Sequence, residues 1–224
     1  TINLIWSFNL KLLLKLLHNS WIIEFSSSVI SYGLEKFNPK LDDGNANSEI
    51  GLAAKFDPKN RNKKPVCYPC PGIVAASFNQ KVAYVVGQSI GEDALWAGYS
   101  GLYGPGANIH RTPYSGRNFE YYSEDAFLSA KCAERSIYGL KTTGKYAFLK
   151  HFALAEGETC RDSYYPWLSE QALREIYLKP FQYAVERGGC VGIMTSYNRI
   201  GSVWCGGSEA LLDGVLRTEW GFKG

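Results

Sequence analysis

Hydrophobic residues recur at helical spacing just after residue 80, and a short apolar segment follows them. Val82, Val86, Ile90 and Ala94 lie on one face of a helix when they are placed at 3.6 residues per turn. We predict a short strand over residues 101–103, because this segment leads directly into a glycine-rich loop. The order helix, strand, loop is the first unit of a pattern that repeats along the chain.

Two further units follow with the same order. Residues 125–140 have apolar positions at helical spacing, and Asp125 can cap that helix. A short apolar strand is predicted over residues 146–150, and residues 167–187 predict the next helix. Residues 191–197 are almost continuously apolar, so we expect this strand to be buried on both faces.

A last helix is predicted over residues 208–219, and residues 220–224 lead to the point where another strand is expected. Strands and helices that alternate at regular intervals predict an α/β protein with a parallel sheet and right-handed crossovers. No glycine motif of the dinucleotide-binding type follows a strand. The pattern therefore favours an incomplete (β/α)8 TIM-like barrel over a Rossmann sheet.

Residues 1–30 do not fit this pattern. They are apolar, but Lys11 and Lys15 interrupt the run, so the segment is a poor membrane span and a poor signal peptide. Its leucines repeat at helical spacing, which is typical of an amphipathic helix. We leave this segment unassigned and predict one partial barrel domain over residues 31–224.

Charge and cysteine content exclude several classes of partner. The formal net charge is +3, and no basic run is long enough to follow a phosphate backbone, so nucleic acid is not expected. Cys67 and Cys70 are the only close cysteine pair, and they have no second pair or histidine at zinc-ligand spacing. We expect no metal, no cofactor and no membrane contact. The compartment stays open, although the cysteine usage favours the cytoplasm.

Polar residues follow the predicted strands. Residues 103–125 combine turn-forming glycines, a basic pair and acids in one loop, and such loops often build sites. Lys150 and His151 end one strand and Tyr197 ends the next, and barrel active sites form at these carboxyl ends. Adjacent strand residues point to opposite faces, so Lys150 and His151 can share a ligand only if the strand ends or bulges there.

These segments, from about residue 67 to residue 224, resemble the N-terminal barrel domain of glycoside hydrolase family 3, the β-glucosidase group. The resemblance implies hydrolysis of terminal β-linked glucose or xylose by a retaining mechanism that uses two carboxyl groups. It also implies a carbohydrate partner. A non-catalytic sugar-binding remnant is the alternative. A nucleotide-binding loop at residues 104–106 is a third reading, but the lysine and spacing of a phosphate loop are missing.

The resemblance assigns two arginines to the sugar site. Arg117 matches the family arginine whose rigid fork binds sugar hydroxyls, and Arg161 matches a second substrate-facing arginine. Each arginine has an alternative role in an ion pair with a nearby acid, either Glu120 or Glu124 for Arg117 and either Asp162 or Glu158 for Arg161.

Three other matches come from the strand ends. Lys150 and His151 match an adjacent pair that donates hydrogen bonds into the sugar subsite, although a histidine in this position can also be an ordinary core residue. Tyr197 matches the tyrosine that hydrogen-bonds the nucleophile and holds it ionised, and packing is its alternative role. We expect His110 to brace its loop and not to contact the sugar.

Asp43 is assigned on a segment that departs from the family pattern. The resemblance implies that this aspartate binds hydroxyls on the far side of the sugar, and Asp42 could hold the role instead. Asn45 replaces a proline of the family, and Glu49 stands in place of an arginine. A further departure is Ala155, where the glucosidases have an asparagine.

The resemblance places neither catalytic carboxyl group within residues 1–224. The nucleophilic aspartate is expected just after Gly224, and the acid/base glutamate in a later domain. We therefore expect that the chain alone does not hydrolyse glycosides. A barrel without its later strands exposes unpaired edges, so we also expect poor solubility. Sugar selectivity, linkage preference and oligomeric state stay open.

Overall fold

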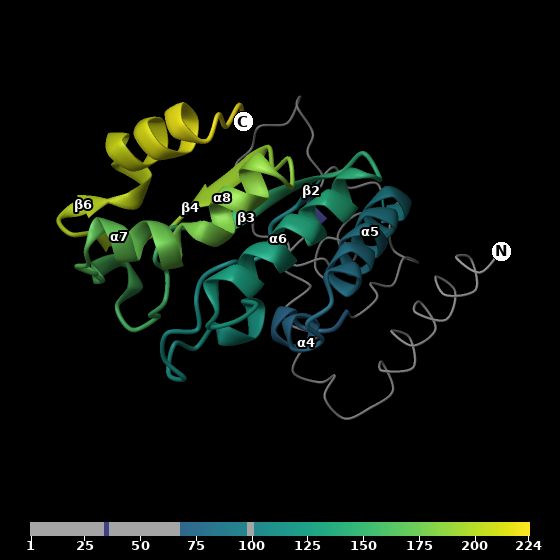
Figure 1. Cartoon of the computed structure of the whole chain (residues 1–224), viewed down its shortest axis with the longest axis horizontal. Coiled ribbons are helices and arrows are strands. Elements are labelled where there is room, and N and C mark those ends of the chain that lie inside the picture. Colours follow the sequence, from purple (N-terminus) through teal and green to yellow (C-terminus); the bar gives the residue numbers. More distant parts are fainter. Residues whose placement is uncertain (1–33, 36–67, 98–100) are drawn as a thin grey trace.

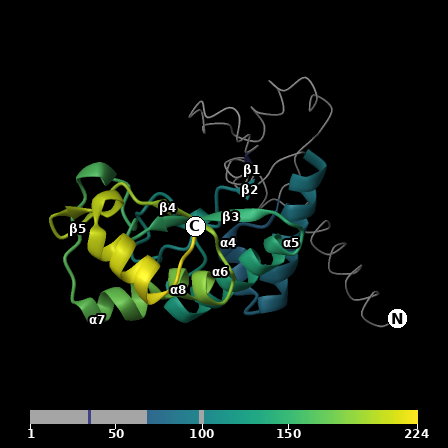
Figure 2. The ribbon, with the colours of Figure 1, turned by 90° about the horizontal axis from the view of Figure 1, so that it is seen from above.

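The computed structural model describes residues 34–35, 68–97 and 101–224 (Figure 1). The predictions for residues 1–30 and for Asp43 lie outside these ranges. In the described part, helices and strands alternate. The helices α5 (Gln80–Ala97), α6 (Ala126–Lys141) and α8 (Lys179–Glu186) lie on one side of the strands β3 (Tyr146–Phe152) and β4 (Gly192–Thr195) (Figure 2).

The described sheet has the order β1-β2-β3-β4. The strands β2 (Gly101–Leu102), β3 (Tyr146–Phe152) and β4 (Gly192–Thr195) run parallel to one another, while β1 (Leu34–Glu35) pairs antiparallel with β2. The three parallel strands lie where the apolar segments predict them. The prediction of parallel strands joined by helices is therefore confirmed for this part of the chain.

The strand β4 is less buried than its sequence predicts. Val191 is 53% exposed, and residues 193–195 of β4 are only half-buried. The prediction of a strand buried on both faces is wrong here because β4 is the outer strand of the described sheet, with β3 as its only described neighbour. An apolar run predicts a strand but does not show whether that strand is central or at the edge of the sheet.

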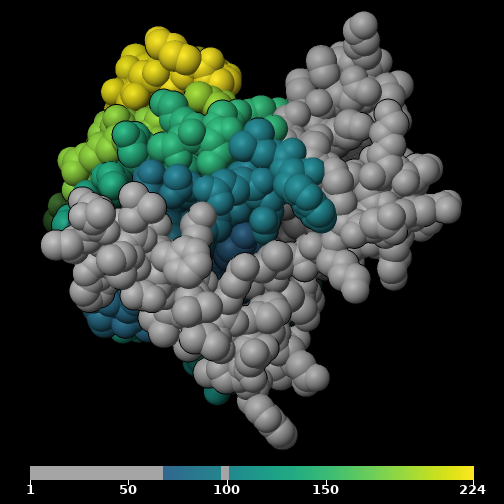
Figure 3. All heavy atoms as spheres, turned by 90° about the vertical axis from the view of Figure 1, so that its right-hand side faces the viewer, coloured from purple at the N-terminus to yellow at the C-terminus, as the bar shows by residue number. Residues whose placement is uncertain are grey.

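Two helices begin close to the predicted residues, α5 (Gln80–Ala97) and α6 (Ala126–Lys141). The short helix α4 (Pro71–Ala76), which the sequence analysis does not predict, precedes them. Asp125 caps α6 by accepting a hydrogen bond from the backbone N–H of Leu128 at 2.6 Å, as the sequence predicts. Figure 3 shows blue, teal and green atoms of the chain on one face, with the C-terminal residues in yellow at its upper edge.

Glycines let α5 and α6 approach closely. A Cβ atom on Gly87 would lie 1.9 Å from the carbonyl oxygen of Ser136, and one on Gly139 would lie 2.1 Å from the carbonyl oxygen of Tyr84. Real Cβ atoms do not approach backbone atoms so closely, so any other residue would separate the two helices. The close packing of these helices fixes the layer that supports the sheet.

The helix predicted over residues 167–187 is interrupted. Ser169 caps the short helix α7 (Glu170–Ala172), a π-helical segment follows over Leu173–Tyr177, and α8 spans Lys179–Glu186. Pro180 has no N–H group to continue the regular hydrogen bonds, so a wider turn precedes it. The sequence therefore predicts the extent of this helical region but not its break.

The last part of the chain contains a hairpin that the sequence pattern does not indicate. The strands β5 (Arg199–Ile200) and β6 (Val203–Trp204) pair antiparallel, and a π-helical segment follows over Ala210–Glu219. Strands of two residues are too short to show a periodic pattern. The predicted helix over residues 208–219 is present, with the wider π-type turn.

The main core lies between the sheet and the helices. Leu149 and Phe152 of β3 contact it from one side, and Ile137 of α6 and Phe181 of α8 contact it from the other. The rings of Phe152 and Phe181 are 5.2 Å apart in an edge-to-face arrangement. Because β3 is anchored in this way, its carboxyl end has a fixed position, and that end carries Lys150 and His151.

None of the helices that the structure describes has both the length and the apolar character needed to cross a bilayer.

Candidate functional site

The loop after β2 is paired with the carboxyl end of β3. The backbone N–H of Lys150 donates to the carbonyl of Pro105 at 3.1 Å, and the N–H of Ala107 donates to the carbonyl of Lys150 at 2.8 Å. Gly106 and Lys150 form a parallel bridge. These hydrogen bonds extend strand pairing into the glycine-rich loop and bring its side chains to the end of β3.

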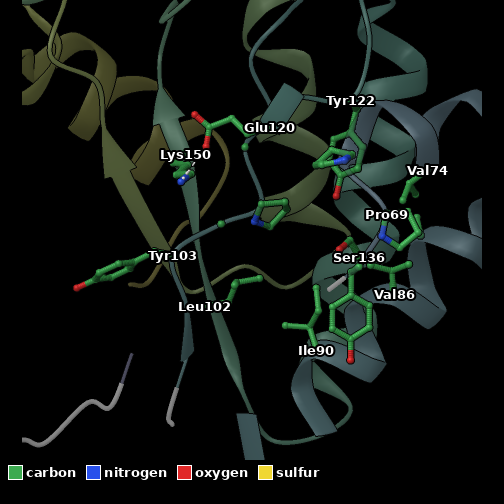
Figure 4. Close-up of a pocket in the computed structure, with 16 residues that line it drawn as sticks. Pro69, Val74, Val86, Ile90, Leu102, Tyr103, Glu120, Tyr122, Ser136 and Lys150 are labelled. Atoms are coloured by element: carbon green, nitrogen blue, oxygen red, sulfur yellow. Dashed lines mark ion pairs between the residues drawn. The ribbon is translucent and has the colours of Figure 1, made fainter. Parts of the chain in front are cut away.

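Glu120 connects two of the predicted site residues. Its Oε2 atom lies 3.1 Å from the Nζ atom of Lys150, and its Oε1 atom pairs with Nε of Arg117. Figure 4 shows Glu120 and Lys150 facing each other across this ion pair. The ion pair with Glu120, predicted as the alternative role of Arg117, is thus present, and it brings Arg117 to Lys150.

Glu158 connects the second arginine to the first. Its Oε2 atom lies 3.2 Å from Nη1 of Arg161, and its Oε1 atom lies 3.7 Å from Nη1 of Arg117. The guanidinium of Arg161 also stacks 4.7 Å from the ring centroid of Tyr197, which is 58% exposed. The alternative ion pair of Arg161 with Glu158 is therefore present as well.

His151 is buried beside this network. The pairing between β3 and β4 shifts register between Lys150 and Phe152, so the strand has the irregularity that two adjacent ligand-facing residues require. The Nδ1 atom of His151 lies 3.1 Å from the hydroxyl of Tyr121. Burial lowers the pKa of His151 well below its usual value, and the positive charges of Arg117 and Lys150 lower this pKa further. The imidazole is therefore neutral at neutral pH.

Tyr121 sets which hydrogen bonds His151 can make. Burial raises the pKa of Tyr121 well above its usual value, so its phenol keeps its proton. When that hydroxyl donates to Nδ1 of the neutral His151, the proton of the imidazole is on Nε2. Nε2 is then a hydrogen-bond donor, which is the role that the resemblance assigns to this side chain.

The structure brings four of the six predicted site residues into one network, and His151 lies beside it. Tyr197 contacts Arg161, Glu158 links Arg161 to Arg117, and Glu120 links Arg117 to Lys150. His151 is the next residue after Lys150 in the chain. The sixth residue, Asp43, lies outside the described residues. His110 braces its loop, as predicted, through Nε2 at 3.0 Å from the carbonyl of Tyr121.

Glu156 is a buried acid beside this network that the sequence does not single out. It is 1% exposed, and its Oε1 atom accepts hydrogen bonds from the N–H of Ile109 at 3.4 Å and from Nδ2 of Asn108 at 3.5 Å. Burial raises the pKa of Glu156 to about 7. Glu156 is covered by the loop that contains Ile109, 47 residues earlier in the chain, so the local sequence does not indicate that this acid is buried.

A cavity of about 80 Å³ lies next to Glu120 and Lys150 (Figure 4). Its walls are mostly apolar and come from α4, α5 and β2, including Val74, Val86, Ile90 and Leu102. Apolar walls offer sugar hydroxyls few partners, so we place the candidate sugar site on the side of the arginines. Within residues 68–97 and 101–224, no group of histidine, cysteine, aspartate and glutamate side chains is arranged to hold a metal ion.

A parallel sheet covered by helices, with basic, imidazole and phenolic side chains at the carboxyl ends of its strands, is typical of (β/α)-barrel proteins. Residues 59–224 match the family described as glycosyl hydrolase family 3 N terminal domain. The chain belongs to this family. The predicted incomplete TIM-like barrel is thus confirmed, and the chain contains only part of the fold.

Known relatives of the chain are β-glucosidases. Beta-glucosidase B of Emericella nidulans is 40% identical over 158 residues, which are 70% of this chain and 19% of the relative. A putative β-glucosidase of Schizosaccharomyces pombe is 41% identical over 164 residues, which are 73% of this chain and 20% of the relative. The chain therefore spans about a fifth of the length of these curated relatives.

A solved structure shows the same fold. β-Glucosidase 3B of Thermotoga neapolitana in complex with glucose superposes with a TM-score of 0.70 and 38% identity, over 75% of this chain and 24% of that protein. The match supports both the barrel fold and membership of the glycoside hydrolases.

Proposed function

We propose that this chain forms part of the glucose-binding barrel of a β-glucosidase that removes terminal β-linked glucose or xylose with retention of configuration. The observation that carries the proposal is the network of Arg117, Lys150, Arg161 and Tyr197, with His151 beside it. Guanidinium, ammonium and imidazole N–H groups donate hydrogen bonds to hydroxyl oxygens in directions that are fixed by the fold.

The charges in this network favour a neutral ligand. Glu120 and Glu158 pair with all three basic side chains, so little positive charge is left to attract a phosphate or carboxylate. A sugar has no formal charge and can exchange hydrogen bonds with both the acids and the bases. This balance supports a sugar over an anionic ligand.

Retaining hydrolysis needs two carboxyl groups about 5 to 5.5 Å apart, one as nucleophile and one as acid/base. The family resemblance assigns neither group to residues 1–224, so we propose that this polypeptide alone binds sugar without turning it over. Tyr197 would hydrogen-bond the nucleophile, and Arg117, Lys150 and His151 would hold the sugar hydroxyls. A non-catalytic sugar-binding protein would use the same residues.

A calorimetric titration of the purified chain with glucose tests this proposal. We expect saturable binding, and we expect Arg161→Ala to weaken the affinity about tenfold, which corresponds to about 1.4 kcal/mol. Arg187→Ala is the matched control, because Arg187 also stacks over a tyrosine ring, at 3.8 Å from the centroid of Tyr183, but has no contact with the network.

Two results would contradict the proposal. The first is equal glucose affinity of the two arginine variants. The second is hydrolysis of an aryl β-glucoside by the same preparation at an ordinary enzyme rate, about 10 per second, which would show that the carboxyl groups lie within this chain.

A further inference from the structure

The backbone of His151 is held by a side chain. The amide of Asn108 donates from Nδ2 to the carbonyl of His151 at 3.0 Å, and Oδ1 of Asn108 accepts from the N–H of His151 at 2.9 Å. Asn108 is 1% exposed. This two-bond contact lies where the pairing of β3 with β4 shifts register, so the Asn108 side chain continues the hydrogen bonding of the strand through its irregular end.

Glu156 reinforces the orientation of the Asn108 amide. Its Oε1 atom lies on the Nδ2 side of that amide, at 3.5 Å, and is held there by the N–H of Ile109. If the amide were reversed, its oxygen would face both the Glu156 oxygen and the carbonyl of His151. Two acceptors repel each other, so Glu156 favours the one orientation in which Asn108 can hold His151.

The surroundings of Glu156 contain one cation and several neutral titratable groups. Arg111 favours the ionised carboxyl, while the field of the carboxyl acts on Tyr121, Tyr164 and Cys205. Its Oε2 atom has no hydrogen-bond partner among the described residues. An ionised carboxyl group only accepts hydrogen bonds and accepts them strongly, so it orients the amide more firmly than a neutral one does.

We propose that Glu156 is a positioning residue, which acts through Asn108 to fix the strand end that carries Lys150 and His151. The importance of this strand end for sugar binding rests on the proposed function. The positioning of the His151 backbone by Glu156 and Asn108 does not depend on the proposed function. In the proposed enzyme, Glu156 would therefore set the affinity for the sugar without touching it.

A double-mutant cycle on the full chain tests this inference. The variants are Glu156→Leu, Asn108→Ala and the two combined. The first readout is the imidazole ¹⁵N spectrum of His151, which can be assigned because the chain has only three histidines. The second readout is the dissociation constant for glucose. Glu156→Gln keeps an oxygen that can accept from Asn108, and Glu134→Leu removes another mostly buried acid, on α6.

We expect each single variant to shift the His151 signals and to weaken glucose binding about tenfold. The combined variant should resemble Asn108→Ala alone, because Glu156 acts only through Asn108. Glu134→Leu should keep the wild-type His151 signals, and Glu156→Gln should shift them less than Glu156→Leu does, because it keeps an accepting oxygen without the charge. Glu156→Leu should also lower the melting temperature, because it leaves the buried N–H of Ile109 without its acceptor, so the His151 signals and not the stability decide the question.

Three outcomes would overturn the inference. They are unchanged His151 signals in Asn108→Ala, additive effects in the combined variant, and a Glu156→Leu protein that melts earlier but keeps the wild-type His151 signals. If Glu156→Leu does not fold, Asn108→Ala and Glu156→Gln decide the question. If the wild-type chain binds no glucose, the proposed function fails, and the His151 signals still test the positioning role.

Discussion

At the residue scale, two acids organise the basic side chains of the candidate site. Glu120 is 6% exposed and pairs with Arg117 and Lys150, while Glu158 pairs with Arg117 and Arg161. Each basic group is therefore held in place before a ligand arrives. Such preorganisation reduces the entropy that binding would otherwise cost.

Removal of the Glu120 charge should destabilise the protein. Glu120→Gln leaves the buried Lys150 without its counter-charge and Arg117 with only Glu158, so we expect the free energy of unfolding to fall by about 3 kcal/mol. Urea denaturation measures this loss. Glu170→Gln is the control, because Glu170 forms an exposed ion pair with Arg174 and should cost less than about 1 kcal/mol. Equal losses in the two variants would contradict this account of Glu120.

Glu156 should make stability depend on pH. Its pKa is raised from 4.5 to about 7 in the folded protein, mainly by burial, so the folded state binds the proton more tightly than the unfolded state. Stability is then greatest below pH 4.5 and falls as the pH rises to 7, by about 3 kcal/mol for this group. We expect the difference in unfolding free energy between wild type and Glu156→Gln to change over this range, and a constant difference would contradict the assignment.

The site was predictable where its signal is local. Lys150 and His151 could be placed because they end an apolar strand. Each of the arginines Arg117 and Arg161 forms an ion pair with an acid that lies three residues away in the sequence. Asn108 and Glu156 could not be found in this way. Their roles depend on a loop that crosses to a strand end more than 40 residues away, and such a contact leaves no periodic pattern.

At the element scale, the close packing of α5 and α6 supports the strand that carries the site. Gly139 lies at this contact, with no room for a Cβ atom beside the carbonyl of Tyr84. Alanine favours a helix by about 1 kcal/mol over glycine, but here the clash opposes that gain.

Gly139→Ala should therefore destabilise the protein, by about 1 to 3 kcal/mol, because the two helices must move apart. Thermal unfolding followed by circular dichroism measures the change. Gly214→Ala is the control, since a Cβ atom on Gly214 would have its nearest neighbour at 3.9 Å, and we expect this variant to be neutral or more stable. A Gly139→Ala protein as stable as Gly214→Ala would show that the helices can separate without loss.

The helices and strands could be predicted from local sequence signals, whereas the burial of each strand depends on its neighbours in the sheet. The cap Asp125 was visible in the sequence because a cap acts on its own helix. Only the assembled sheet shows that β4 is its outer described strand, so the burial prediction for β4 is wrong. The hairpin of β5 and β6 was missed because its strands are too short for a periodic signal.

At the scale of the whole molecule, the chain is a part of a family 3 glycosyl hydrolase barrel, and we propose that it carries one side of a sugar site. The parallel strands bring the loops that follow β2, β3 and β4 to one edge, and the network of acids and bases forms there. The fold class was predictable because strands and helices alternate regularly along the chain. The site residues lie close together because the carboxyl ends of parallel strands are at the same edge of the sheet.

The most direct test of this account is a crystal structure of the chain with glucose. The account predicts one glucose molecule at the carboxyl ends of β3 and β4, with Arg117, Lys150 and His151 within hydrogen-bond distance, about 2.7 to 3.2 Å, of its hydroxyls. Glucose bound elsewhere, or a site that stays empty at saturating glucose, would contradict it.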